Sequence, residues 1–250
     1  MSQNNLFAVE RRKGVVIIAS AVIVAVALGF GLAKVGAGFA SRAASGITVT
    51  GSAKTTAKAD NVVWTLNISH VAPTVSPAIA KVNAGVDAVT KYLTDAGITE
   101  KEITLGSLSS YGNEEWVNGN STGRIISYRV SRDVTIRTKN VDLVFKLSQG
   151  IGTVIASGVP VNNYGPQYLI STLADLRPKL LAEAMKDAKV RADAITEAVG
   201  GSVGAVTNVR SGVIQVTTPD STMASDAGMY DTSSIEKTVT ATVSVTFQTK

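Results

Sequence analysis

The sequence predicts an α+β fold: antiparallel sheets with two long helices packed on one face, arranged as two similar halves and preceded by one N-terminal transmembrane helix. Three observations carry this prediction. Segments that alternate apolar and polar residues follow one another directly along the chain, which favours antiparallel pairing. Two longer segments repeat apolar residues every three or four positions, as amphipathic helices do. Residues 14–33 contain no charged residue.

The apolar run at residues 14–33 predicts a membrane anchor that the protein retains. A helix of about 20 residues crosses the roughly 30 Å hydrocarbon core, whereas the apolar region of a cleavable signal has roughly 7–15 residues. A basic triplet at residues 11–13 precedes the run and Lys34 follows it. Positive charge stays in the cytoplasm, so residues 1–13 are expected there. In a bacterium, the chain beyond the anchor then lies in the periplasm or at the outer surface, and late processing after Lys34 stays open.

Small residues recur at every fourth position of the predicted anchor. This spacing places them on one helix face, where the backbones of two membrane helices can approach closely. The alternative is that Ala and Gly are simply common in membrane helices. The residues expected to mediate membrane-helix packing are Ala21, Ala25, Gly29 and Ala33.

The chain after the anchor begins with a linker and two strands. Residues 34–46 are rich in Gly, Ala and Ser and read as a linker. The remaining residues, 47–250, form the predicted periplasmic domain. A first strand starts at Ile47 and a clearer one at Asn61. The second strand has one apolar face, made of Val62, Trp64, Leu66, Ile68 and His70.

The first predicted helix follows these strands. It starts at Ser76-Pro77 and stops at Gly97. We then expect a strand over 103–111, a polar hairpin loop over 114–123 and a long strand over 124–138. The apolar stripe of the helix consists of Ile79, Val82, Val86, Val89 and Leu93.

The second half partly repeats this order. A short helix from Val141 to Gln149 is capped by Asn140, and a strand lies near 164–171. The longest helix spans about 178–199, with Pro178 in its first turn because proline is tolerated there. A strand over 202–216 and a long loop over 217–235 follow. The narrow apolar stripe of the long helix is expected to consist of Leu181, Ala184, Ala188, Ile195 and Val199.

The final strand alternates strictly between apolar and hydroxyl residues. Its apolar face needs a covering helix, and its edge invites another copy of the chain. After Glu236 the only charged residues are Lys237 and Lys250, so few charges oppose such pairing. Identical contacts repeated about an axis close into a ring when the rotation permits. The apolar face is made of Val239, Ala241, Val243, Val245 and Phe247.

Composition excludes several classes of function. The chain of 250 residues carries a formal charge of +5 with 5% aromatic residues. This net charge is too small, and the aromatic side chains that could stack on bases are too few, to indicate a nucleic-acid partner. The chain has no cysteine, which removes thiol chemistry and disulfides, and its single histidine leaves too few soft ligands for zinc. We expect no cofactor and no metal.

No catalytic residues emerge from the sequence. His70 is the one histidine, and a lone histidine on an apolar strand face is usually a structural residue. The segment 220–231 carries Asp220, Asp226 and Asp231, but it lacks the Gly and Glu of a calcium-binding loop and reads as a solvated loop. The glycines from Gly200 end a helix instead of opening one, so Gly200 is expected to be a C-cap and not a phosphate cradle.

Four segments together resemble the SIMPL-domain family of bacterial periplasmic or outer-surface proteins. They are VTGSAK (49–54), SYRVSRDVTIR (127–137), AEAMKDAKVRADAI (182–195) and DTSSIEKTVTATVSVTF (231–247). The chain departs from the family at Ala59-Asp60, where many members have Pro-Asp. The resemblance implies an α+β fold, homo-oligomers with ring- or channel-like assembly, and a link to tolerance of oxidative stress. It supplies no catalytic residues.

These observations predict a non-enzymatic, inner-membrane-anchored periplasmic protein that self-assembles into a ring- or channel-like homo-oligomer, linked to envelope or oxidative-stress tolerance. The expected partners are other copies of the chain and, through the N-terminal helix, the membrane. The alternative is a periplasmic binding module that captures a small molecule, a peptide or an envelope component. A hydrolase that uses His70 ranks last.

Overall fold

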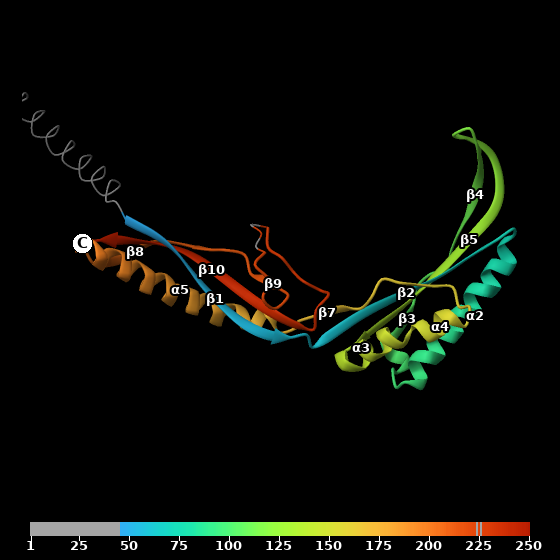
Figure 1. Ribbon diagram of the computed structural model, residues 1–250, viewed down its shortest axis with the longest axis horizontal. Coiled ribbons are helices and arrows are strands. Elements are labelled where there is room, and N and C mark those ends of the chain that lie inside the picture. Colours follow the sequence, from blue (N-terminus) through green and yellow to red (C-terminus); the bar gives the residue numbers. More distant parts are fainter. Residues whose placement is uncertain (1–45, 224, 226) are drawn as a thin grey trace, which may run out of the picture. The chain divides into compact units, whose positions relative to one another are not determined.

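Figure 1 shows the computed structural model of the chain, which describes residues 46–223, 225 and 227–250. The predicted anchor at 14–33, with Ala21, Ala25, Gly29 and Ala33, lies outside the described residues. Within the described part, every helix is too short or too polar to cross a bilayer. The described chain divides into two compact units. One comprises residues 46–49, Lys189–Arg210 and Ser244–Lys250, and the other comprises Thr50–Ala188 and Ser211–Val243.

Two sheets with flanking helices make the fold α+β, as predicted. The six-stranded sheet has the order β3-β5-β2-β6, with β4 also paired to β5 and β7 to β2, and all of these pairings are antiparallel. The elements associated with it are β2 (Asn61–Ala72), α2 (Val75–Asp95), η1 (Glu100–Glu102), β3 (Ile103–Leu105), β4 (Ser109–Val117), β5 (Asn120–Thr138), α3 (Val141–Gly150), α4 (Gly152–Ala156), β6 (Val161–Asn163) and β7 (Gln167–Leu169).

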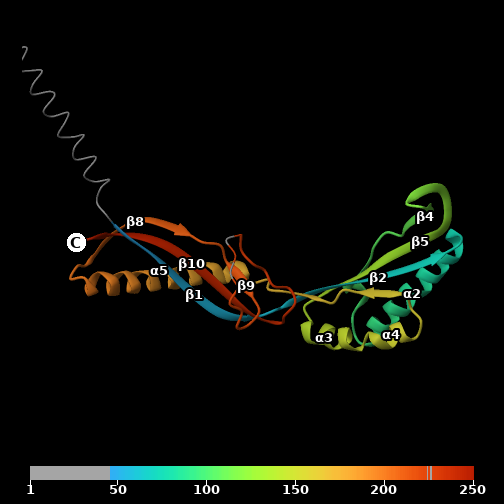
Figure 2. The same cartoon turned by 45° about the horizontal axis from the view of Figure 1, so that its top comes forward.

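Helix α2 covers the apolar face of the six-stranded sheet, along β2 and β5 (Figure 2). The predicted stripe of α2 is buried from Val82 to Leu93, with Ile79 packed against the same core. Trp64 on β2 is fully buried, and its indole N–H donates to the Asn163 side chain at 2.9 Å. Helix α3 begins as predicted, because the Asn140 side chain accepts the Leu143 N–H at 3.2 Å.

The second sheet has the order β1-β10-β8, with β9 also paired to β10. Its strands are β1 (Gly46–Lys58), β8 (Val203–Ser211), β9 (Gln215–Thr217) and β10 (Glu236–Thr249), and α5 (Leu173–Ala198) is its helix. The alternation predicted for β10 is confirmed, since Val239, Ala241, Val243, Val245 and Phe247 are all buried. The prediction that β10 lies at the edge of its sheet is wrong, because β10 has neighbours on both sides.

The two long helices cover different sheets, so the prediction that both pack on one face is wrong. Leu180 of α5 belongs to a core with Val216 and Val239 of the four-stranded sheet, whereas α2 packs on β2 and β5. The physical reason is that β2 and β10 each present an apolar face of their own. One amphipathic helix is needed for each face. The similarity of the two halves stays a prediction.

Helix α5 approaches β1 very closely. A Cβ added to Gly51 would lie 2.1 Å from the Ala184 carbonyl oxygen and 2.4 Å from the Ala188 nitrogen. The Ser52 N–H of β1 also donates to the Asp187 carboxylate of α5 at 2.8 Å. The small residues are therefore required here, since only a glycine facing alanines lets strand and helix backbones come this near.

The buried row of α5 differs from the predicted stripe. It consists of residues spaced four apart, Leu180, Ala184, Ala188, Ala192 and Thr196. Ile195 and Val199, predicted to be in the stripe, are 50% and 81% exposed. The helix also starts at Leu173, five residues before the predicted start, so Pro178 lies inside it. The helix thus begins more than one turn before Pro178, the residue that was expected to lie in its first turn.

A long hairpin replaces the loop predicted at 114–123. Strand β4 runs to Val117 and β5 starts at Asn120, so most of the predicted loop is strand. Asn118 and Gly119 have positive φ angles of 51° and 80°. These values suit the two-residue turn whose twist matches the flanking strands, and Asn-Gly is its favoured sequence.

Lys237 is a buried cation that anchors the segment before β10. Its side chain is fully buried, and its ammonium donates to the Asp231 carbonyl at 2.6 Å and to the Asp231 carboxylate at 3.0 Å. Lys237, which the sequence placed among the few charges that could oppose pairing at an edge, is therefore not an edge charge at all. Burial alone would raise the pKa of Asp231, but hydrogen bonds from Ser234, Ser233 and Lys237 outweigh it and hold this pKa far below its usual range.

Replacing Asp231 with Asn is expected to lower the free energy of unfolding by about 3–5 kcal/mol, because the Lys237 charge would stay buried without its counter-ion. The carboxylate has a depressed pKa in the folded state, so its contribution is complete above pH of about 4 and declines as the pH falls further. Urea unfolding at pH 7 and at about pH 3 measures both effects. The gap between the native and Asp231→Asn proteins should narrow at the lower pH.

The matched control is Asp220→Asn, in an exposed residue of the same segment. Asp220 has a positive φ of 60°, which Asn tolerates, so this change should stay within about 0.5 kcal/mol. Equal unfolding midpoints for Asp231→Asn and Asp220→Asn would refute the role of the buried pair.

Candidate interaction surface

The β4–β5 hairpin continues past the sheet to which it belongs. The pairing of β2 with β5 ends at Ala72 opposite Tyr128, and beyond that point β5 pairs with β4 alone. We call this segment, Asn113–Ser127, the arm. Figure 1 shows it as the green hairpin that curves away from β2. A two-stranded ribbon is marginally stable in water by itself, so the arm needs a further contact to be well ordered.

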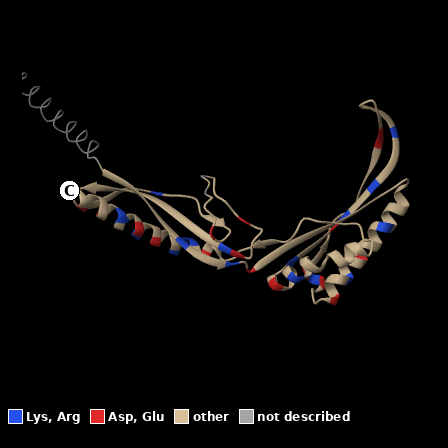
Figure 3. Cartoon of the chain, viewed as in Figure 1, with Lys and Arg blue, Asp and Glu red and all other residues tan. Residues whose placement is uncertain are grey.

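The arm exposes large apolar side chains. Trp116 is 67% exposed, and Val117, Ile125 and Ile126 are 51%, 41% and 52% exposed. Charged positions along its ribbon are few (Figure 3). Clustered apolar residues of this size on a protein surface mark an interaction site, whereas scattered single ones do not.

Two of these side chains continue the face of the sheet that α2 covers. Ser110 lies opposite the buried Val130, so Gly112, two residues on, shares that face. A Cβ at Gly112 would meet the Ile125 side chain at 2.9 Å, which places Ile125 there as well. Glu114 is paired with Ile125, and Trp116 follows two residues later. The face of the sheet that α2 covers thus continues along the arm, where Ile125 and Trp116 lie on it without a helix over them.

The acidic pair at the arm has structural partners. Arg124 Nε donates to Glu115 at 3.0 Å, and these side chains form an ion pair. The hydrogen bonds from Arg124 and then Thr122 hold the pKa of Glu115 below its ordinary value. Glu114 instead accepts a hydrogen bond from the Ser121 hydroxyl. Each carboxylate has its own partner across the hairpin, so they fix the arm's register and do not form an acid–base pair.

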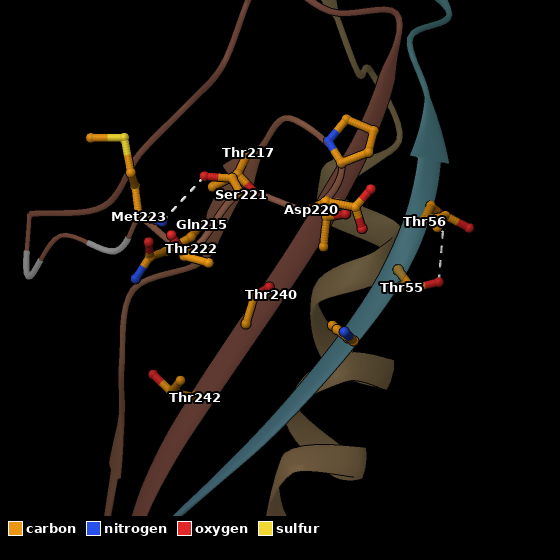
Figure 4. Close-up of a pocket in the computed structure, with 13 residues that line it drawn as sticks. Thr55, Thr56, Gln215, Thr217, Asp220, Ser221, Thr222, Met223, Thr240 and Thr242 are labelled. Carbon is orange, nitrogen blue, oxygen red and sulfur yellow. Dashed lines mark hydrogen bonds between the residues drawn. The ribbon is translucent and has the colours of Figure 1, made fainter.

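A separate cavity of about 510 Å³ lies on the hydroxyl face of β10. Figure 4 shows Thr240 and Thr242 on β10, with the loop that carries Ser221 and Met223 beside them. Its volume is in the range of small-molecule sites, but such sites have mostly apolar walls. The residues around this cavity are Lys54, Thr55, Thr56, Gln215, Thr217, Pro219, Asp220, Ser221, Thr222, Met223, Thr238, Thr240 and Thr242.

The residues considered for chemistry do not come together in the structure. His70 is half-buried on β2, opposite Val130, and no group of three acidic, His or Cys residues within the described part could hold a metal. Asp231 forms the buried pair with Lys237, Asp220 borders the cavity, and Asp226 lies outside the described residues. Gly200 has a φ of 77° at the end of α5, which confirms it as the helix C-cap.

The sequence contained a signal for the arm that the loop prediction did not use. Asn118-Gly119 is the strongest short hairpin signal when apolar residues flank it. Here the flanks are mixed: Glu114 and Glu115 precede the turn, and Asn120, Ser121 and Thr122 follow it. The polar flanks favour a loop because a strand this exposed has no buried face to impose a period of two.

Comparisons with known proteins identify the family. No curated protein matches the chain. Two amidases of the hydantoinase/carbamoylase family, from Burkholderia multivorans and Burkholderia vietnamiensis, show 15% and 19% identity with TM-scores of 0.24 each. They match 49% and 50% of this chain, which spans 28% and 32% of the amidase chains. A similarity this low supports no conclusion about fold or function. Residues 47–247 match SIMPL, a protein family of unknown function (DUF541), so the chain belongs to the SIMPL family.

Proposed function

We propose that the protein is a non-enzymatic component of the bacterial envelope that self-assembles into a closed, ring- or channel-like homo-oligomer. Residues 14–33 anchor it in the inner membrane by a single span, with residues 1–13 in the cytoplasm and the domain in the periplasm. Its physiological role is in tolerance of envelope or oxidative stress, as the family resemblance implies.

The arm is the observation that carries this proposal. It projects Trp116 and Ile125 on a sheet face that lacks its helix, and a second copy of the chain can cover that face. Aromatic anchors surrounded by smaller apolar residues are the typical energetic centres of protein–protein contacts. The four-stranded sheet adds support, because β1 is a 13-residue edge strand and unpaired edges favour pairing between chains.

The full chain, extracted in detergent, is expected to have a protein mass several times the 25.9 kDa of one copy. Light scattering coupled to size exclusion measures this mass, and negative-stain images should show ring-like particles. Replacing Trp116 and Ile125 with Ser should shift the mass toward one copy, because it removes the apolar surface of the arm. The control is Tyr164→Ser, which alters a side chain that is 85% exposed and lies off the arm.

A monomeric native protein at roughly micromolar concentration would contradict self-assembly. An unchanged oligomer in the Trp116→Ser/Ile125→Ser protein would instead show that assembly uses another surface. Circular dichroism of both variants distinguishes loss of contact from loss of fold.

The anchor is expected to remain on the mature protein. Its apolar run is longer than a cleavable signal allows, and the basic triplet before it holds the N-terminus inside. Intact mass spectrometry of protein purified from membranes should include residues 1–33. A mature N-terminus between Ala37 and Ser45 would overturn the anchored arrangement.

His70→Gln is expected to leave assembly and any stress phenotype unchanged, with at most a modest loss of stability. The half-buried ring on β2 has a structural role in this proposal. Complete loss of phenotype in a folded, normally assembled His70→Gln protein would restore the hydrolase interpretation.

The second candidate function is a periplasmic module that captures a small molecule, a peptide or an envelope component. The cavity beside β10 favours it, because its walls offer many hydroxyl groups together with the Lys54 and Asp220 side chains. A monomeric protein whose thermal midpoint rises with an added polyhydroxylated ligand, and in which Thr240→Val removes that rise, would favour this function over assembly.

A further inference from the structure

A second uncovered apolar surface lies at the C-terminal end of α5. Val190, Ile195 and Val199 are 66%, 50% and 81% exposed, and Ala194 and Ala198 beside them are exposed as well. We call these five residues the α5 patch. Val190, Ala194 and Ala198 form one row spaced four residues apart, and Ile195 lies on the adjacent row of the helix. Val199 follows directly after Ala198, the last residue of the helix. The buried row of the helix, which ends with Ala192 and Thr196, is a different face.

The arm and the α5 patch are complementary kinds of surface. The arm is a sheet face without a helix, and the patch is a helix face without a sheet. An amphipathic helix on one face of a sheet is the arrangement that α2 already makes with β2 and β5. Each surface therefore lacks the element type that the other supplies.

The dimensions of the two surfaces also agree. Two neighbouring strands about 4.8 Å apart make a ribbon roughly 10 Å wide, and a helix with its side chains is about 10–12 Å across. The arm strand Asn113–Val117 extends about 14 Å at 3.4 Å per residue. The helical residues 190–198 extend about 12 Å along the helix axis at 1.5 Å per residue. One helix therefore fills the arm face, and the ribbon has no width for two.

One acidic residue on the arm and one basic residue before the α5 patch are of opposite sign, although both surfaces also carry other charges, such as Arg124 on the arm and Glu197 beside the patch. Glu114 lies on the arm face and accepts a hydrogen bond from a neutral partner, Ser121. Lys186 precedes Val190 by about one helical turn, and it has no acidic partner within the described residues, unlike Lys189, which pairs with Asp193 at 2.7 Å. An acidic group on the arm thus has a cation available at the border of the patch.

We propose that the arm of one copy packs on the α5 patch of the next copy, with Trp116 and Ile125 against Ile195 and Val199. This inference rests on the self-assembly proposed above and names its interface. The contact is heterologous, since each copy offers its arm to one neighbour and its patch to another. Repetition of such a contact closes into a ring when the rotation permits.

Cysteine pairs test this contact directly, because the chain has no cysteine of its own. Ser121→Cys places a thiol on the arm opposite Trp116, and Ala194→Cys places one in the patch; both changes leave the large apolar side chains intact. Two full-length chains with different affinity tags, one carrying each change, are co-expressed and oxidised in membranes. Non-reducing gels should show a disulfide-linked dimer that contains both tags, and each variant expressed alone should stay unlinked.

The matched control replaces Ala194→Cys with Ala182→Cys. Ala182 is also an exposed alanine of α5, but it lies on the opposite side of the helix from the patch, so it should not link to Ser121→Cys. Links between two Ser121→Cys chains would overturn the arm-to-helix contact in favour of arm against arm. Absence of any link in a protein that light scattering shows to be oligomeric would also overturn it, while self-assembly would stand. Absence of links in a monomeric protein would overturn both.

Discussion

The buried Lys237–Asp231 pair is the constraint on which the arrangement of the larger unit depends. Asp231 is held by Ser233, Ser234 and Lys237, and its own N–H donates to Val216 of β9 at 2.8 Å. The residues that follow reach the other sheet. The Thr232 carbonyl accepts the Tyr168 N–H of β7, and the Ile235 carbonyl accepts the Ala59 N–H just before β2. One buried cation therefore fixes a segment that bonds to strands of both sheets, and it does so without a disulfide.

The small number of helices that cover the sheets accounts for the exposed apolar surfaces. Each sheet has one long helix, and the buried face of each helix packs on its own sheet. The arm extends its sheet past the end of the β2 pairing, and α5 carries more apolar residues than its buried row requires. An isolated copy therefore leaves apolar surface in water on both elements. The association of copies proposed above would bury this surface without adding any element to the chain.

The sequence predicted those elements whose side chains repeat with a clear period. Helix α2, the Asn140 cap of α3 and the alternation of β10 all follow from local patterns that burial enforces. The sequence could not assign α5 correctly, because alanines bury less apolar area than Ile195 or Val199 yet occupy the tight contact with Gly51. It could not show that Lys237 is buried either, since the carboxylate that makes burial tolerable belongs to an apparently solvated loop. The arm was missed because an exposed ribbon imposes no burial pattern, and pairing of the two helices with separate sheets depends on contacts far apart in the chain.

Strand β5 has a mechanical consequence. It is one continuous strand of 19 residues, from Asn120 beside the hairpin turn to Thr138 in the core. Any part of a force on the arm that is directed along β5 in the sheet is opposed by the hydrogen bonds between β2 and β5, from Ala72–Tyr128 to Val62–Thr138, which lie across the strand axis. The load is then shared by the whole ladder in shear, so that bonds are not peeled apart one at a time. An arm joined to its core in this way can pass tension from a bound partner into the core of the sheet.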